Sequence, residues 1–336
     1  MYRRYGPIVA EENPGRQTVV HLFSADDFRT LYQYEGKVPH RSGLRPLKAY
    51  HKAKPECFPN AGILNVQGEE WRHVRGAVQS STIRPKTVRS YASILNKTSD
   101  DTLKLIAAHR DENGEVEDCN EIMQRWSLEY DLVNIMDSLM VRIPFSHYFE
   151  MPTVEKFKLI AKELSPRMLR VFHNALSSVC LRDESGDDFT ILQRLQNDNK
   201  LVFNEMFTFV HDFLVASTHT TEMRTILSVA GRLEENFTNA SQFVPERWMR
   251  PNEKDAEDED RKAWTLHPFA SIPFSMGPRM CIGRRISELE LSILLAKVLR
   301  KYRVENHHGD IGFYTRFMSR PERAAKFRFV DLLRPC

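Results

Sequence analysis

The sequence predicts a mainly α-helical fold with small β-sheets, arranged as a single domain over residues 1–336. Two observations support this prediction. Apolar residues recur at helical spacing through most of the chain, whereas only short segments near its two ends have the composition of strands. With 41% hydrophobic residues, 14 glycines and 17 prolines, the chain can bury a large core and has no long low-complexity tract.

The first elements can be placed from local signals. Residues 17–23, QTVVHLF, predict a short strand. Ser24 and Asp27 then form a capping signal for a helix that follows directly. Residues 37–68 contain four prolines and are expected to be rich in loops, and a further helix is expected to begin near Glu69.

Most of the middle of the chain is predicted to be helical, and the C-terminus to contain strands. Residues 231–250 lose the helical periodicity, and the charge run at 252–262 is expected to be a solvated loop. Apolar spacing between Ile286 and Val298 predicts another helix, after which 312–319 and 326–333 are expected to pair as two strands. The helical patterns before them cover residues 85–108, 120–140, 154–180, 189–197 and 201–230.

Composition excludes several functional classes. The net charge of +3 is too small to indicate nucleic-acid binding. Five scattered cysteines without a CxxC pair indicate a reducing compartment and disfavour a disulfide framework or a structural zinc site. No stretch approaches the roughly 20 apolar residues of a membrane span. The first residues have neither a signal-peptide core nor a convincing transit peptide, so no address is expected in this chain.

Residues 273–285, PFSMGPRMCIGRR, concentrate unusual residue types around Cys281. A cysteine just before a helix lies at the positive end of the helix dipole, which stabilises the thiolate that ligates metals. Gly277 permits a sharp turn, and Gly283 permits close approach of a flat ligand to the backbone. Arg279 is placed to pair with a carboxylate on that ligand.

One thiolate without neighbouring ligands cannot build a tetrahedral zinc site, whereas one axial ligand is enough for haem. Two alternatives remain open at this point. Cys281 can be a small hydrophobe packed in a Gly/Pro turn. It can also be the nucleophile of a hydrolase, although no segment supplies a recognisable base motif.

The stretch 274–283, FSMGPRMCIG, resembles the haem-binding loop of the cytochrome P450 family at every diagnostic position. The resemblance implies a cytochrome P450-like fold and haem as the cofactor. It implies that Cys281 is the axial thiolate ligand of the haem iron, and that Arg279 contacts a haem propionate. Phe274 would pack beside the sulfur, and Gly283 would line the haem plane.

Three other segments resemble the same family. Trp71 and Arg75, in EEWRHVR, lie four residues apart and are similar to the pair that contacts the haem propionates. His267, in HPFASIPF, resembles another propionate contact, and Arg247, in FVPERW, resembles an arginine of a buried ion network. The alternatives are an amphipathic surface helix for the first pair and a solvated loop residue for His267.

Residues 282–290, IGRRISELE, and the opening YGPIV resemble the mitochondrial branch of the family. That resemblance implies a monooxygenase that uses O₂ and electrons from a ferredoxin to hydroxylate a small apolar substrate, such as a sterol or related lipid. It implies a mitochondrial location with peripheral contact at the inner membrane. Arg284 and Arg285 are candidates for docking the acidic ferredoxin.

Residues 216–221, ASTHTT, depart from the family's oxygen-activating pattern (A/G)-G-x-(D/E)-T. Thr220 falls at the threonine that delivers protons to bound O₂. His219 replaces the acid and can relay protons near neutral pH, while Ser217 replaces the glycine that leaves space for O₂. The alternative is that Thr220 is an ordinary threonine inside a helix.

The family's Glu-x-x-Arg pair is missing from residues 222–241, and the segment 130–157 looks shortened. Arg247 is therefore expected to lose its two partners, which for a buried charge costs about 3–5 kcal/mol. These departures predict an incomplete cytochrome P450 fold with internal deletions. They also leave a second functional hypothesis, namely a non-catalytic remnant that binds haem weakly or not at all.

Overall fold

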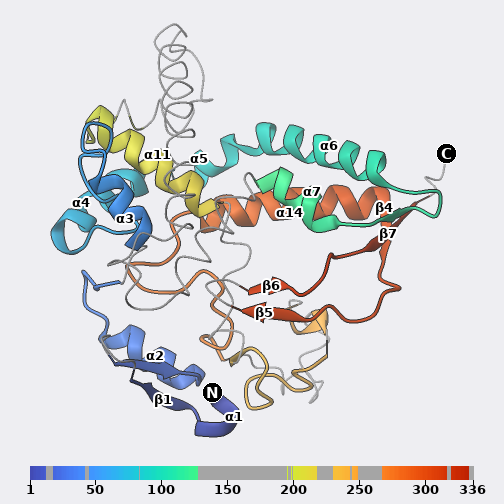
Figure 1. The fold of residues 1–336 in the computed structure, drawn as a ribbon, viewed down its shortest axis with the longest axis horizontal. Coiled ribbons are helices and arrows are strands. Elements are labelled where there is room, and N and C mark those ends of the chain that lie inside the picture. Colours follow the sequence, from blue (N-terminus) through green and yellow to red (C-terminus); the bar gives the residue numbers. More distant parts are fainter. Residues whose placement is uncertain are drawn as a thin grey trace, which may run out of the picture. The chain divides into compact units, whose positions relative to one another are not determined.

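The computed structural model describes residues 1–12, 18–41, 45–82, 84–127, 195, 198, 200–217, 230–242, 244–248, 267–315 and 319–332 (Figure 1). The chain divides into two compact units. The first unit comprises Met1–Lys37 and Met223–Cys281, and the second comprises Val38–Glu222 and Ile282–Cys336. The single domain expected over 1–336 stays a prediction, and each unit is described by itself.

The first unit begins with a hairpin and a capped helix. Strands β1 (Ile8–Glu11) and β2 (Val19–Leu22) pair antiparallel, as the strand prediction for 17–23 required. Helix α2 (Ala25–Tyr34) follows. The Ser24 hydroxyl accepts a hydrogen bond from the backbone N–H of Asp26, the second residue of this helix, which confirms Ser24 as the cap. The hairpin is preceded by the short helix α1 (Tyr2–Tyr5).

The remainder of the first unit consists mainly of turns. A short 3₁₀ helix, η2 (Pro245–Trp248), lies in the region where the sequence loses its helical periodicity. The buried Phe28 of α2 packs with Ala230 and Ile272, so the helix anchors segments that follow it by more than 200 residues. The predicted loop at 252–262 lies outside the described residues.

Three helices of the second unit surround one hydrophobic core. They are α3 (Arg45–Lys52), α4 (Gly68–Thr82) and α11 (Phe203–Ser217). Helix α4 confirms the prediction near Glu69. Helix α3 lies within residues 37–68, which were expected to be rich in loops, and was not itself predicted. Pro46 is the second residue of α3, where proline costs no hydrogen bond, so it permits the helix.

A second core of this unit is formed around α6 and α14, which lie alongside each other (Figure 1). The helical pattern predicted over 85–108 is split at Tyr91, and the final predicted helix is present in full. The core buries Ile106, Leu294 and Tyr302. The helices around it are α5 (Pro85–Ser90), α6 (Ala92–His109), α7 (Cys119–Ser127) and α14 (Arg284–Lys301).

The C-terminal strands pair differently from the prediction. Segments 312–319 and 326–333 do not pair with each other. Instead, β5 (Phe313–Thr315) pairs antiparallel with β6 (Ser319–Pro321). Strand β7 (Phe327–Asp331) is the centre of an antiparallel sheet between β3 (Glu115–Val116) and β4 (Tyr302–Glu305). The partners of β7 are distant in sequence, so local pattern did not reveal them.

Three of the predicted helical segments fall wholly or largely on undescribed residues. Segment 154–180 lies entirely outside the described ranges, segment 189–197 is described only at position 195, and segment 120–140 is described only over 120–127. No helix in the described ranges is both long and apolar enough to cross a membrane.

Candidate functional site

The loop that carries Cys281 belongs to the first unit and is closed by its own backbone. The Cys281 N–H donates to the Phe274 carbonyl at 3.0 Å, and the Met280 N–H donates to the Gly277 carbonyl at 3.1 Å. Ser275 and Gly277 have φ angles of 61° and 74°, so the loop turns twice through the left-handed region. The half-buried thiol is therefore held at the end of a tight and specific turn.

Helix α2 packs against this loop, and no pattern in the sequence predicted the contact. The Tyr32 hydroxyl lies 2.8 Å from the Ser275 hydroxyl, and the Tyr32 ring stacks on Phe269. The Glu35 carboxylate packs so closely against Gly277 that any side chain at that position would collide with it. Glycine at position 277 is thus favoured by its φ angle, and a larger residue would also displace the Glu35 side chain.

His267 also lies in the first unit, close to the start of α2. Its Nδ1 accepts a hydrogen bond from the Phe269 N–H at 3.2 Å, so the proton of the neutral ring resides on Nε2. The buried Nε2 lies 3.4 Å from an Asp26 carboxylate oxygen but makes no hydrogen bond of normal geometry among the described residues. His267 can therefore donate to an additional oxygen.

Trp71 and Arg75 lie in the second unit, on one face of α4 as predicted. Their exposed fractions are 4% and 9%. The Arg75 Nε donates to the Gln79 side-chain oxygen at 3.2 Å. A guanidinium buried to this extent matches a carboxylate in charge and geometry, so the surface-helix alternative does not describe this pair.

The other predicted residues divide between the units or lie outside the described ranges. Arg279 is half-buried in the first unit, and Gly283 is the N-cap of α14 in the second, two residues after Cys281. Thr220 and His219 follow the described end of α11 and lie outside the described residues. Of the described candidate residues, His267, Phe274, Arg279 and Cys281 belong to the first unit, and Trp71, Arg75 and Gly283 belong to the second.

Arg247 corrects the expectation of a stranded buried charge. It is half-buried in η2, and its guanidinium donates to three backbone carbonyls: those of Thr238, Asn239 (2.6 Å) and Gln242 (3.1 Å). These neutral acceptors close a turn within the first unit. Arg247 thus needs no carboxylate partners to satisfy its donors.

The cytochrome P450 family model matches residues 1–130 and 221–326, which together make up most of the chain. The chain belongs to the cytochrome P450 family. The segment between the two matched blocks includes most of the region in which the structure describes few residues.

Two curated relatives align with this chain over most of its length. A probable cytochrome P450 301a1, mitochondrial, of Drosophila melanogaster is 24% identical over 98% of this chain and 80% of its own length. The 1,25-dihydroxyvitamin D(3) 24-hydroxylase, mitochondrial, of Mus musculus is 22% identical over 90% of this chain and 77% of its own length. The fold agrees, since a retinoic acid-bound cyanobacterial CYP120A1 superposes with a TM-score of 0.70 at 13% identity. That superposition covers 98% of this chain and 93% of the other.

The alignment with the Drosophila relative also shows internal deletions. It extends over 450 positions, whereas this chain has 336 residues. At least 114 positions of that alignment therefore have a residue in the relative and none here. This agrees with the shortened segments and the missing Glu-x-x-Arg pair.

The described residues fit a haem with a thiolate ligand. Cys281 forms no disulfide and is half-buried at the end of its loop. His267 has a buried N–H with no hydrogen bond, and Arg75 is a buried cation, so both units contain donors for propionate oxygens. Each observation concerns one unit alone, and together they provide the types of group that haem requires.

Proposed function

We propose that this cytochrome P450 is a haem-thiolate monooxygenase that receives electrons from a ferredoxin and hydroxylates an apolar substrate, such as a sterol or related lipid. The observation that carries the proposal is the closed loop that ends at Cys281 in a chain of this family. The overall reaction inserts one oxygen atom of O₂ into a C–H bond. It releases the other atom as water, with consumption of two electrons and two protons.

The residues of this chain would contribute binding, orientation and proton transfer. When bound, haem supplies the iron centre at which O₂ is activated. The Cys281 thiolate would ligate the iron, with Phe274 packed beside the sulfur. Arg279 and His267 would donate to propionate oxygens.

On the second unit's side, Trp71 and Arg75 would hold the propionates, and Gly283 would allow the backbone to approach the cofactor. The Thr220 hydroxyl would hold a proton for transfer, and His219 would replenish it. An imidazole changes its charge nearer to neutral pH than a carboxylic acid does, so proton delivery is expected to be more sensitive to pH near neutrality than with a carboxylic acid.

The proposed substrate class and location rest on relatives. Both relatives described above are named mitochondrial, and one of them is named as a hydroxylase of 1,25-dihydroxyvitamin D(3). An apolar polycyclic substrate and a mitochondrial location are the corresponding proposals for this chain. The ferredoxin donor and peripheral contact at the inner membrane are proposed from the resemblance of residues 282–290 to the mitochondrial branch of the family.

The test is the carbon monoxide difference spectrum of the reduced, haem-loaded protein. We expect the Soret shift that a thiolate ligand produces, and we expect Cys281→Ser to abolish it. Cys57→Ser is the matched control, because Cys57 is also half-buried and free of disulfides, and it should leave the spectrum unchanged. A histidine-type spectrum in the unsubstituted protein would contradict the assignment of Cys281.

The second candidate is a non-catalytic remnant, which the 114 or more missing positions favour. In that case the purified chain would take up no stoichiometric haem. It would also form no product when supplied with O₂, reduced ferredoxin and a panel of sterols. A thiolate-type spectrum together with hydroxylated product would exclude this candidate.

A further inference from the structure

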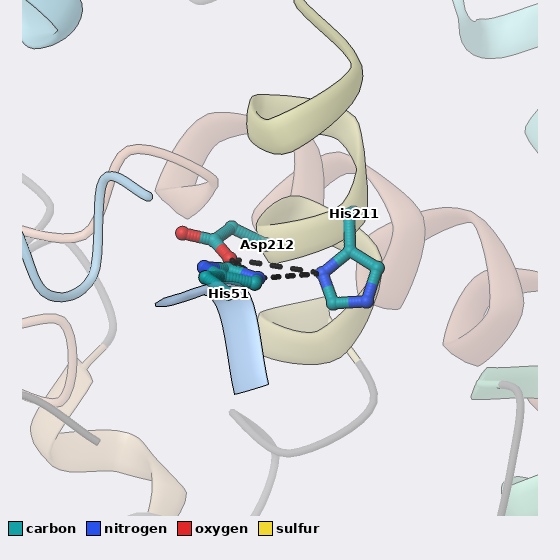
Figure 2. Close-up of side chains that lie close together, drawn as sticks. All are labelled: His51, His211 and Asp212. Atoms are coloured by element: carbon teal, nitrogen blue, oxygen red, sulfur yellow. Dashed lines mark hydrogen bonds and ion pairs between the residues drawn. The ribbon is translucent and has the colours of Figure 1, made fainter. Parts of the chain in front are cut away.

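A compact cluster of potential metal ligands lies in the second unit, among residues to which the proposed function assigns no role. It consists of His51 on α3 and His211 and Asp212 on α11 (Figure 2). The side-chain exposed fractions are 0% for His51, 8% for His211 and 0% for Asp212. The two histidines are 160 residues apart in sequence, so the fold brings them together.

The three ligand atoms form an almost regular triangle. His51 Nε2 lies 3.4 Å from His211 Nδ1 and 3.6 Å from Asp212 Oδ1, and His211 Nδ1 lies 3.8 Å from the same oxygen. For these sides, the point equidistant from the three atoms is about 2.1 Å from each, which matches Zn–N and Zn–O bonds of about 2.0–2.2 Å. The two ring nitrogens and the carboxylate oxygen converge on this point (Figure 2).

Hydrogen bonding within the protein leaves the carboxylate unsatisfied. Asp212 Oδ2 accepts the Leu64 N–H at 3.3 Å, but Oδ1 is buried with no hydrogen-bond donor among the residues that the structure describes. When both histidines are neutral, their two facing ring nitrogens can form only one hydrogen bond, in which one nitrogen donates and the other accepts. A buried carboxylate without a donor or a cation is costly, so a positive charge at the centre of the triangle would stabilise this arrangement.

Burial favours the neutral imidazole of His51, which is the form that ligates metals. Burial lowers the pKa of His51, while the negative charge of Asp212 acts in the opposite direction. The backbone of Ala61 also raises the pKa of His51, although Nδ1 makes no hydrogen bond of normal geometry. The Phe58 ring stacks on His51 and meets His211 edge-on, which fixes both rings in an apolar shell.

The local backbone is adapted to the carboxylate. Gly62 has a φ of 75°, and any side chain there would collide with Asp212. The turn that contains Gly62 therefore brings its backbone directly against the acid, and the Leu64 N–H of the same turn donates to it. This arrangement holds the second carboxylate oxygen in place and leaves the first directed at the histidines.

We propose that His51 Nε2, His211 Nδ1 and Asp212 Oδ1 bind one divalent transition-metal ion, with Zn²⁺ as the occupant. Two imidazoles and one carboxylate are a ligand set that Zn²⁺ accepts, with a fourth position for water or another oxygen. The ion would join α3 to α11 directly before the stretch 216–221. It would thus hold the N-terminal side of that stretch against α3 and the turn at Gly62. This proposal does not depend on haem binding.

The experiment is a metal titration of the full chain after removal of metals with a chelator. The probes are Co²⁺, followed by its visible absorption, and Zn²⁺, added in competition. The background substitution Cys281→Ser removes the thiolate that would otherwise add a sulfur-to-cobalt charge-transfer band. We expect one Co²⁺ per chain, a spectrum of nitrogen and oxygen ligation, and displacement by one equivalent of Zn²⁺.

The ligand assignment is tested in two variants and a control. Asp212→Asn keeps the shape and the acceptor for Leu64, and His211→Ala removes a ring. Each should weaken Zn²⁺ binding at least 100-fold, because loss of even an outer partner costs about 10–100-fold. His109→Ala removes an exposed histidine from α6 and should leave the affinity unchanged.

Two outcomes would overturn the proposal. The first is the absence of saturable binding of one equivalent in the unsubstituted protein, a result that needs no folded variant. The second is equal affinity in the Asp212→Asn protein, with circular dichroism showing that it is folded. A rise in Tm with Zn²⁺ in the unsubstituted protein and none in Asp212→Asn would support the site independently.

Discussion

At the scale of single residues, burial gives the cysteines different reactivities. Cys119 is 8% exposed, and burial raises the pKa of its thiol to about 11, with smaller effects from Phe327 and Asp118. Cys57 and Cys281 are half-buried. Because the thiolate is the nucleophile, Cys119 is expected to be inert while the half-buried thiols remain reactive. The function proposed for Cys281 depends on that difference.

Alkylation of the haem-free protein with iodoacetamide at pH 8 should therefore proceed at least tenfold more slowly at Cys119 than at Cys57. With its pKa raised to about 11, Cys119 has roughly 100-fold less thiolate than the ordinary cysteine value of 9.0 would give it, and its greater intrinsic nucleophilicity offsets only part of this. Peptide mapping by mass spectrometry measures both rates. In urea the two rates should converge, and equal rates in the folded protein would contradict the pKa of Cys119.

Arg247 lies in a segment that resembles the family motif, but its hydrogen-bond partners differ from the carboxylates expected there. In the FVPERW segment it was expected to be a buried charge left without carboxylates. The structure instead gives it three carbonyl acceptors in its own unit. A stranded buried charge costs about 3–5 kcal/mol, whereas a half-buried guanidinium with satisfied donors avoids that cost. The missing Glu-x-x-Arg pair therefore does not by itself destabilise this segment.

At the scale of elements, the half-buried Glu290 carboxylate on α14 lowers the stability of the folded protein when it is charged. Burial raises the pKa of Glu290, and no hydrogen bond or ion pair compensates it among the described residues. Because the folded-state pKa exceeds the unfolded value, stability is greater at low pH and is lost as pH rises through the folded pKa. Glu288, two residues earlier, is exposed and paired with Arg284 at 2.7 Å.

Glu290→Gln should thus raise the stability of the haem-free protein at pH 7, by about 1 kcal/mol or less. The gain should shrink as pH falls through the raised pKa of Glu290, because the protonated acid resembles the amide. Urea unfolding followed at several pH values measures the gain. Glu288→Gln is the control and should lose a few tenths of a kcal/mol, as expected for an exposed ion pair. A gain for Glu290→Gln that grows at low pH would contradict the prediction.

The same elements show which features local sequence could predict. Helices α2, α4 and α14 were predicted because a capping residue or an apolar stripe lies within each helix. The cysteine loop was predicted because all of its diagnostic residues lie in one contiguous stretch of the sequence, residues 274–283. Helix α3 was missed because prolines outweighed its pattern, although Pro46 lies where a helix tolerates proline.

Features that depend on distant segments were missed. Tyr32 and Ser275, which support the cysteine loop, are 243 residues apart, and His51 and His211 are separated by 160. Strand β7 pairs with β3 and β4 instead of the neighbouring segment, and no local period specifies such pairing. Two of the three ligands in the metal cluster lie on one helix, but the third could not be found without the fold.

At the scale of the whole molecule, the proposed electron transfer requires docking of an acidic partner. Arg284 and Arg285 form the first turn of α14, which has no acidic residue, and both are exposed. Cations at a helix N-terminus oppose the dipole at a cost of about 0.3–1 kcal/mol each. Arg285 is taken as the probe of a docking role, because removal of Arg284 would also break its ion pair with Glu288.

Arg285→Gln should slow association with reduced ferredoxin several-fold at low ionic strength and make the rate less dependent on salt. The reason is that a rim charge acts mainly through steering, which is screened over about 10 Å at 0.1 M salt. Stopped-flow formation of the reduced carbon monoxide complex measures this rate across a salt series. Arg300→Gln is the matched control, because it removes an exposed arginine at the other end of the same helix and leaves the net charge equal to that of the first variant. If the association rate falls equally in both variants, net charge alone explains the effect. A fall confined to Arg285→Gln would support a ferredoxin contact at the start of α14, which follows the cysteine loop in sequence.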